Sequence, residues 1–209
     1  MSEADLTMGG HVPGIMEESP FAIPSKKLVM WLFIISDAVT FGAMLFAYGY
    51  VKNASPDWPE PFTFSPSIIN VMLMTFILVT SSLTMLVATR AAKAGDKAAG
   101  IRWTFVTVGG GFLFALLHIR EWSRLIGEGV RLFQNPWGSP MFGATFFAIT
   151  GLHLTHVIGG VIALTVVALG YKRGRYNSDD IEICALYWHF VDLVWMFVVP
   201  MVYLLNIKR

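Results

Sequence analysis

The sequence predicts an all-α integral membrane protein, built as a bundle of five transmembrane helices. Three observations lead to this fold class. Only 14% of the 209 residues are charged, whereas a soluble domain carries about 25%. The mean hydropathy is +0.61. Five segments have the roughly 20 largely apolar residues that a helix needs to cross a bilayer. Much of the chain is therefore expected to face lipid.

Short connections rich in turn-forming residues separate the predicted spans. The first connection, 52–67, contains four prolines and cannot continue a helix. The last one supplies Ser178 as N-cap and Asp179 and Asp180 as acids of the first turn. The expected spans are residues 28–51, 68–89, 101–124, 141–170 and 181–207, within one transmembrane domain of residues 26–209.

Residues 1–25 are polar, mildly acidic and rich in Gly and Pro. They lack the basic stretch followed by an apolar stretch that marks a signal peptide. We expect them to form an extended, mostly aqueous tail.

The charge distribution predicts how the bundle sits in the membrane. Nine of the 15 Lys and Arg residues fall on the side of the N-terminus, counting the loops after the second and fourth spans. The positive-inside rule then places the N-terminus in the cytoplasm and the C-terminus outside. A net charge of +1 gives no reason to expect a nucleic-acid partner. The single cysteine excludes a disulfide or a cysteine-based metal site within the chain.

Ionisable residues inside a span are costly and therefore need a reason. The candidates are Asp37, Glu121, His153, His156, His189 and Asp192. A protonatable carboxyl at mid-depth in the first span makes Asp37 a candidate for handling protons or binding a lipid headgroup. With a helix rise of about 1.5 Å per residue, three groups could lie at one depth in the bundle: Asp37, the pair His153 and His156, and the pair His189 and Asp192.

Spacing groups the other candidates. His153 and His156 are three residues apart and share a helix face, as do His189 and Asp192. Trp188 and Trp195 flank the second pair as packing anchors. Small residues beside the histidines allow a neighbouring helix to approach closely; they are Gly151, Gly159 and Gly160.

These polar residues admit three interpretations. One is bis-histidine ligation of a haem, although the usual repetition of paired histidines at two depths is missing. Another is a dinuclear metal site, although the expected Glu-x-x-His repeats are absent. The third is a network of hydrogen bonds between helices, formed by Glu121, His153, His156, His189 and Asp192. Spacing alone favours the third interpretation.

Four motifs resemble those of subunit III of haem–copper cytochrome oxidases. The most specific are "TGLHLTHVIGG" at 150–160 and "YWHFVDLVWMF" at 187–197. The segment "FIISDAVTFGAMLFAYGY" at 33–50 resembles the family's helix with a buried acid, and "REWSRL" at 120–125 resembles its Glu-Tyr or Glu-Trp element. The chain is identified as a member of this family in its five-helix bacterial form.

The resemblance implies a non-catalytic subunit with no catalytic residue, metal or redox centre of its own. Haems and copper would lie in partner subunits, with subunit I as the main contact and subunit II and smaller subunits as further partners. The family's buried acid falls on Asp37. A V-shaped cleft holding phospholipid would lie between the first two helices and the remaining three.

The resemblance also implies a function in respiratory reduction of oxygen to water with proton pumping, in a bacterial inner membrane. The subunit would support assembly, lipid retention, oxygen access and proton uptake by subunit I. A quinol oxidase with a similar subunit III is the alternative, because the electron donor is bound by other subunits. A stand-alone channel or transporter is less consistent with five helices that show no pair of discontinuous repeats.

Overall fold

The computed structural model describes residues 24–208. Nearly all of the expected tail, 1–25, therefore lies outside the described residues, and Ser25 already begins a helix. Five long helices follow: α1 (Ser25–Ala54), α2 (Ile69–Lys93), α3 (Lys97–Gly127), α4 (Met141–Lys172) and α5 (Ser178–Val198). Short helical turns extend two of them, η1 (Phe64–Ile68) before α2, and η2 (Val199–Tyr203) with η3 (Leu204–Asn206) after α5.

The predicted fold class is confirmed. Five helical segments of the described chain are long and apolar enough to cross a membrane. The first four predicted spans lie within one such segment each, and the fifth ends one residue beyond its segment. Within residues 24–208 the only β-type pairings are two isolated bridges, Phe62 with Ile207 and Arg131 with Gln134.

One helix start differs from the prediction by a residue. The N-cap of α5 is Asn177 rather than Ser178. The Asn177 side chain accepts hydrogen bonds from the backbone N–H groups of Asp179 and Asp180, at 3.0 and 3.1 Å. The Asp180 carboxylate in turn accepts from the Asn177 backbone N–H at 3.0 Å. This reciprocal capping box satisfies more backbone donors than Ser178 could one residue later.

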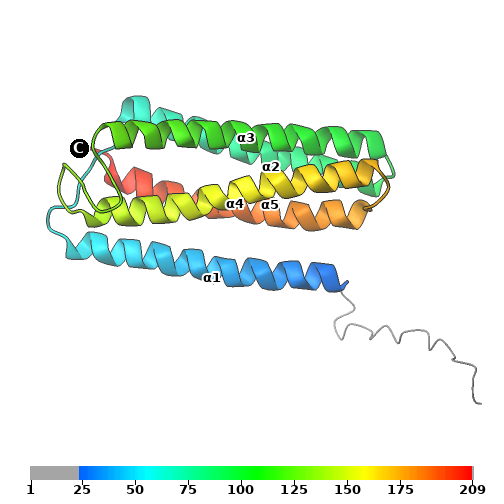
Figure 1. Cartoon of the computed structure of the whole chain (residues 1–209), viewed down its shortest axis with the longest axis horizontal. Helices are drawn as coiled ribbons and strands as arrows, with labels where there is room; N and C mark the ends of the chain where they lie inside the picture. The colour runs from blue at the N-terminus through cyan, green and yellow to red at the C-terminus, as the bar shows by residue number, and fades with distance from the viewer. Residues whose placement is uncertain (1–23, 209) are drawn as a thin grey trace, which may run out of the picture.

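The helices run up and down in one bundle (Figure 1). α2 packs most extensively against α3, and α5 packs against both α2 and α4, so α2 to α5 form a closed group of four. α1 lies on the outside of this group, against α4 and α5. Its buried residues Ile34, Phe41, Leu45 and Tyr48 form one stripe at helical spacing.

The expected cleft between the first two helices and the other three is therefore assigned to the wrong helices. α2 belongs to the group of four, and α1 packs against α4 and α5 rather than pairing with α2. Hydropathy locates spans but carries no information about which spans are neighbours, because all lipid-facing helices have similar composition. Neighbours are determined by side-chain fit at each helix face.

Two buried tryptophans of α5 fasten the four-helix group. The Trp188 indole N–H donates to Ser81 Oγ and the Trp195 indole N–H to Thr75 Oγ1, both at 3.0 Å and both on α2. On α4, a Cβ added at Gly160 would come 2.8 Å from the Trp188 ring. Glycine at 160 therefore provides the space that this ring occupies.

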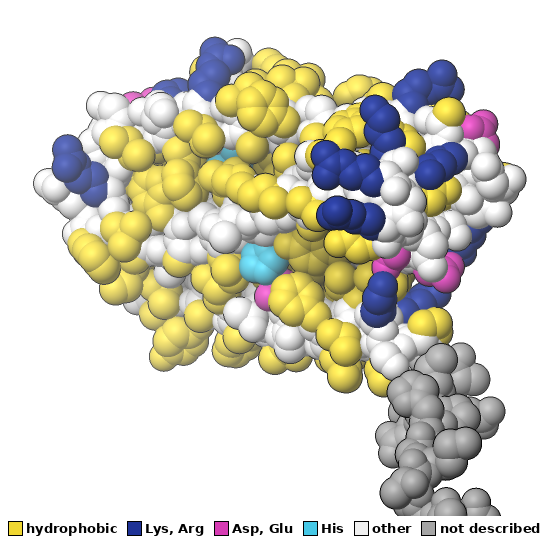
Figure 2. Space-filling model, turned by 45° about the vertical axis from the view of Figure 1, so that its right-hand side comes forward, with side chains coloured by type: hydrophobic (Ala, Val, Ile, Leu, Met, Phe, Trp, Pro, Cys, Tyr) yellow, Lys and Arg dark blue, Asp and Glu magenta, His cyan; other side chains and the backbone are white. Residues whose placement is uncertain are grey.

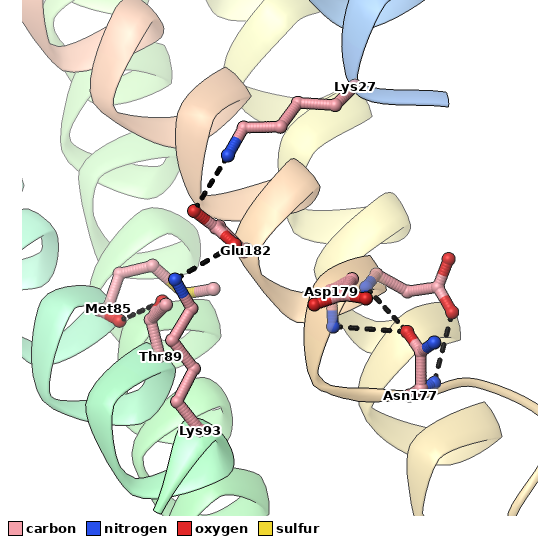
Figure 3. A network of polar contacts seen from close by, with 8 residues as sticks. Lys27, Met85, Thr89, Lys93, Asn177, Asp179 and Glu182 are labelled. Carbon is pink, nitrogen blue, oxygen red and sulfur yellow. Dashed lines mark hydrogen bonds and ion pairs between the residues drawn. The ribbon is translucent and has the colours of Figure 1, made fainter. Parts of the chain in front are cut away.

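One end of the bundle carries ion pairs between helices. Glu182 of α5 binds Lys27 of α1 at 3.0 Å and Lys93 of α2 at 2.9 Å, as Figure 3 shows. Lys26 also pairs with Asp180, at 2.8 Å. The start of α1 and the loops after α2 and α4 meet at this end (Figure 1), so the basic residues predicted to face the cytoplasm lie together.

The opposite end is closed by the C-terminal segment. The buried side chain of Asn206 donates to the Tyr48 hydroxyl and to the Val202 carbonyl, and accepts from the Trp58 indole N–H. Backbone hydrogen bonds join Phe62 to Asn206 and Lys208. The proline-rich connection after α1 is thereby held against the end of α5.

Candidate functional site

An acid–histidine pair joins α1 to α4 within the spans. His156 Nε2 lies 2.8 Å from Asp37 Oδ2. The side chains are only 14% and 13% exposed, respectively. The other ring nitrogen, His156 Nδ1, lies 2.8 Å from the Leu152 carbonyl oxygen. Because a carbonyl oxygen can only accept, Nδ1 carries a hydrogen.

The contact is a close approach of a carboxylate oxygen and a ring nitrogen across two helices, at ion-pair distance. Aromatic neighbours enclose the pair: the Phe41 ring meets the His156 ring edge-on at 5.4 Å, and the Tyr187 hydroxyl donates to the His156 carbonyl at 3.0 Å.

An apolar groove lies one turn along α1 from this pair, between α1 and α5. Its volume is about 240 Å³. Its walls include Phe41 and Gly42 of α1 and Phe190 and Phe197 of α5. On the face shown in Figure 2 the middle of the surface is likewise mostly hydrophobic, with Lys and Arg gathered toward the ends. The Asp37–His156 pair thus lies beside an apolar groove.

His153 has a different environment from His156. It is fully buried, and its ring stacks on Trp195 with centroids 5.0 Å apart. Phe114 and Phe41 meet the same ring edge-on. Within the described part of the chain, neither ring nitrogen has a hydrogen-bond partner. His153 therefore acts mainly as an aromatic packing residue.

His118 is a buried residue of α3 that was not among the candidates predicted from the sequence. It stands against Phe114, Trp122 and Trp195, and its ring nitrogens also lack a hydrogen-bond partner among residues 24–208. Its position two residues before "REWSRL", and on the same helix face as Phe114 and Trp122, could have identified it from the sequence.

The remaining candidates lie on other interfaces. Asp192 of α5 lies near Ser82 of α2 and His189. Glu121 of α3 accepts from Asn70 Nδ2 at 3.2 Å and from Arg124 Nη2 at 2.9 Å. The predicted network is thus divided among the α1–α4, α2–α5 and α2–α3 interfaces.

No hydrogen bond in the described chain joins any two of the five residues predicted to form that network: Glu121, His153, His156, His189 and Asp192. Among residues 24–208, no group of three or more His, Cys, Asp or Glu side chains is placed to hold a metal ion.

The predicted packing residues lie at helix contacts. Trp188 and Trp195 are fully buried. A Cβ added at Gly151 would come 3.2 Å from the Trp122 ring, and one added at Gly159 would reach ordinary contact, 3.7 Å, with the Tyr187 hydroxyl. Only Gly160 is in a position where an added methyl would overlap a neighbour in this set.

Comparison with known proteins identifies relatives along nearly the whole chain. The family described as cytochrome c oxidase subunit III matches residues 21–207. Cytochrome c oxidase subunit 3 of Bacillus sp. (strain PS3) is 33% identical over 87% of this chain and 86% of its own length. Quinol oxidase subunit 3 of Bacillus subtilis (strain 168) is 30% identical over 86% of this chain and 87% of its own length.

A third relative is a fused protein. The haem–copper oxidase subunit I+III of Aeropyrum pernix is 28% identical over 93% of this chain, which corresponds to 24% of that longer protein. The family match over residues 21–207, the five-helix fold and the four sequence motifs agree. The chain therefore belongs to the cytochrome c oxidase subunit III family.

Proposed function

We propose that this chain is the non-catalytic subunit III of a respiratory haem–copper oxidase in a bacterial inner membrane. It flanks subunit I, and subunit II and smaller subunits are further partners. Haems and copper of the partner subunits carry out the reduction of oxygen and the associated proton pumping. The fused subunit I+III relative supports the pairing with subunit I, because in that protein the two are parts of one chain.

The observation that carries this role is the Asp37–His156 pair beside the apolar groove. The pair holds α1 at mid-depth, and the groove beside it suits a lipid chain or a small apolar molecule such as oxygen. The subunit thereby stabilises the assembled oxidase, retains phospholipid and supports oxygen access and proton uptake by subunit I.

The electron donor is proposed to be cytochrome c, with a quinol as the alternative. Relatives of both kinds match at similar identity, 33% and 30%. The N-terminus is proposed to be cytoplasmic and the C-terminus periplasmic, because the more basic end of the bundle contains the start of α1.

Affinity purification of the tagged chain from its native membrane tests the assignment. We expect a large haem-bearing subunit to copurify and the isolated chain to show no haem absorption. A chain that purifies without such a subunit, or that has its own haem spectrum, would contradict the proposal. In the same preparation, a subunit II with bound copper and oxidation of reduced cytochrome c distinguishes cytochrome c from quinol as donor.

A further inference from the structure

We propose that a second lipid site lies on the α2–α3 hairpin and binds the phosphate of a membrane phospholipid between two arginines. The site is a cavity of about 420 Å³ at the end of the bundle where α2 begins and α3 ends. Ser65, Asn70, Arg120 and Arg124 form its polar rim, and Ile69 and Leu73 form an apolar wall. None of these residues belongs to α1, so the site is separate from the groove beside Asp37.

Two arginines and one carboxylate, that of Glu121, line the cavity. The Glu121 carboxylate is 5% exposed, and both of its oxygens accept hydrogen bonds within the protein, one from Arg124 and the other from Asn70. The Arg124 Nε atom is buried and donates no hydrogen bond to any described residue. It lies 3.7 Å from an oxygen of the Glu128 carboxylate.

Arg120 adds a second cation at the same rim. It is exposed and lies four residues before Arg124, so the two side chains share a face of α3. Two guanidinium groups thus face a cavity whose one lining carboxylate is already bonded. Planar guanidinium groups match the oxygen geometry of a phosphate and bind it through charge-assisted hydrogen bonds.

The apolar wall distinguishes a phospholipid from a free anion. Ile69 and Leu73 are 50% and 48% exposed and lead from the polar rim along α2, where Met72 and Phe76 continue the exposed apolar surface. The rim lies where α3 approaches its end at Gly127, the level at which lipid headgroups meet a transmembrane helix. A phosphate at the arginines with a hydrocarbon chain along α2 uses both parts of the cavity.

The test uses the whole oxidase complex, stripped of loosely bound lipid and titrated with phosphatidylglycerol. Bound lipid is counted by native mass spectrometry. Arg120→Gln should weaken binding at this site about tenfold, the loss expected for one charge-assisted hydrogen bond, and Arg120→Lys should recover part of it. Arg102→Gln, which removes an exposed arginine from the opposite end of α3, is the matched control and should bind normally.

Several results would overturn the proposal. Equal lipid binding by the Arg120→Gln and Arg102→Gln complexes would exclude the arginine as a ligand. Release of a partner subunit by Arg120→Gln, with lipid binding unchanged, would assign the cavity to protein contact. Inorganic phosphate binding as tightly as phosphatidylglycerol would exclude a contribution from the apolar wall.

An unmodified complex provides a test that does not depend on folding of a variant. Phosphatidylglycerol should be retained at least about tenfold more strongly than diacylglycerol, which lacks the phosphate. Equal retention would refute the site. Either failure leaves the proposed role beside subunit I intact, since that role depends on α1 and on copurification.

Discussion

Replacing Asp37 with alanine is expected to loosen α1 from the rest of the bundle. α1 buries only four side chains, and Asp37 supplies a polar link between α1 and α4 within the span. The 2.8 Å contact joins two side chains that are 13% and 14% exposed, so water compensates little for its loss. The His156 Nε2 atom would then face a mostly apolar surrounding without its partner.

The magnitude follows from the range measured for polar contacts between transmembrane helices, which average about 0.6 and reach about 1.7 kcal/mol. The low exposure of both partners places this pair at the upper end of the membrane range. A loss of about 1.4 kcal/mol raises tenfold the equilibrium constant for opening, in which α1 detaches from α4 and α5.

Hydrogen exchange of α1 amides in the purified oxidase measures this opening. Asp37→Ala and His156→Ala should each raise exchange about tenfold in the middle of α1, and the double variant should add little to either. Thr40→Ala is the matched control, because the Thr40 hydroxyl bonds only the Ser36 carbonyl of its own helix. The complex should still assemble, with a shorter turnover lifetime and less bound phospholipid.

Two outcomes would refute this reasoning. Additive effects of Asp37→Ala and His156→Ala would mean that the two side chains do not act as a pair. Equal exchange in the Asp37→Ala and Thr40→Ala complexes, with unchanged lifetime and lipid content, would remove the link between this contact and function.

Two further predictions concern packing and charge. Gly160→Ala should lower the free energy of unfolding by about 1–3 kcal/mol through overpacking, because the new methyl group meets the Trp188 ring. Gly49→Ala is the control, because a methyl group there meets open space and should cause no such loss in a thermal unfolding measurement. Equal losses in the two variants would contradict the packing argument. Glu182→Gln weakens two ion pairs at once and should cost only about 0.5–1 kcal/mol, since the pairs lie at the surface. The cost should shrink at high salt, and a loss that salt does not change would indicate a role in packing instead.

The helices were predictable because lipid imposes a simple rule on composition and length. A run such as 141–170 has no charged residue, and α4 begins at the predicted residue. The start of α5 was missed by one residue because Asn177 and Ser178 are both good N-caps. Only the reciprocal bond with Asp180 decides between them.

The partners of the polar residues were harder to predict. His153 and His156 share a face by spacing, yet His153 packs on Trp195 and His156 reaches Asp37. A difference of three residues turns a side chain by about 60° around the helix axis, which is enough to direct it to a different neighbour. Likewise His189 and Asp192 lie at a suitable depth for α4, but the rotation of α5 directs Asp192 toward α2.

The position of α1 also has a consequence for biogenesis. α1 leaves the ribosome first, but the helices against which it packs, α4 and α5, are synthesised last. α2 and α3 can pair as soon as both are inserted, whereas the contacts of α1 with α4 and α5 form only after those helices are made. An 18-residue stretch of α1 has a mean hydropathy of 2.0, which suits a helix that stays in the bilayer before those contacts form. Lys26 and Lys27 at its start are expected to orient it by the positive-inside rule. The acid of α1 meets His156 only when that residue arrives, so formation of the pair marks a late step in completing the subunit.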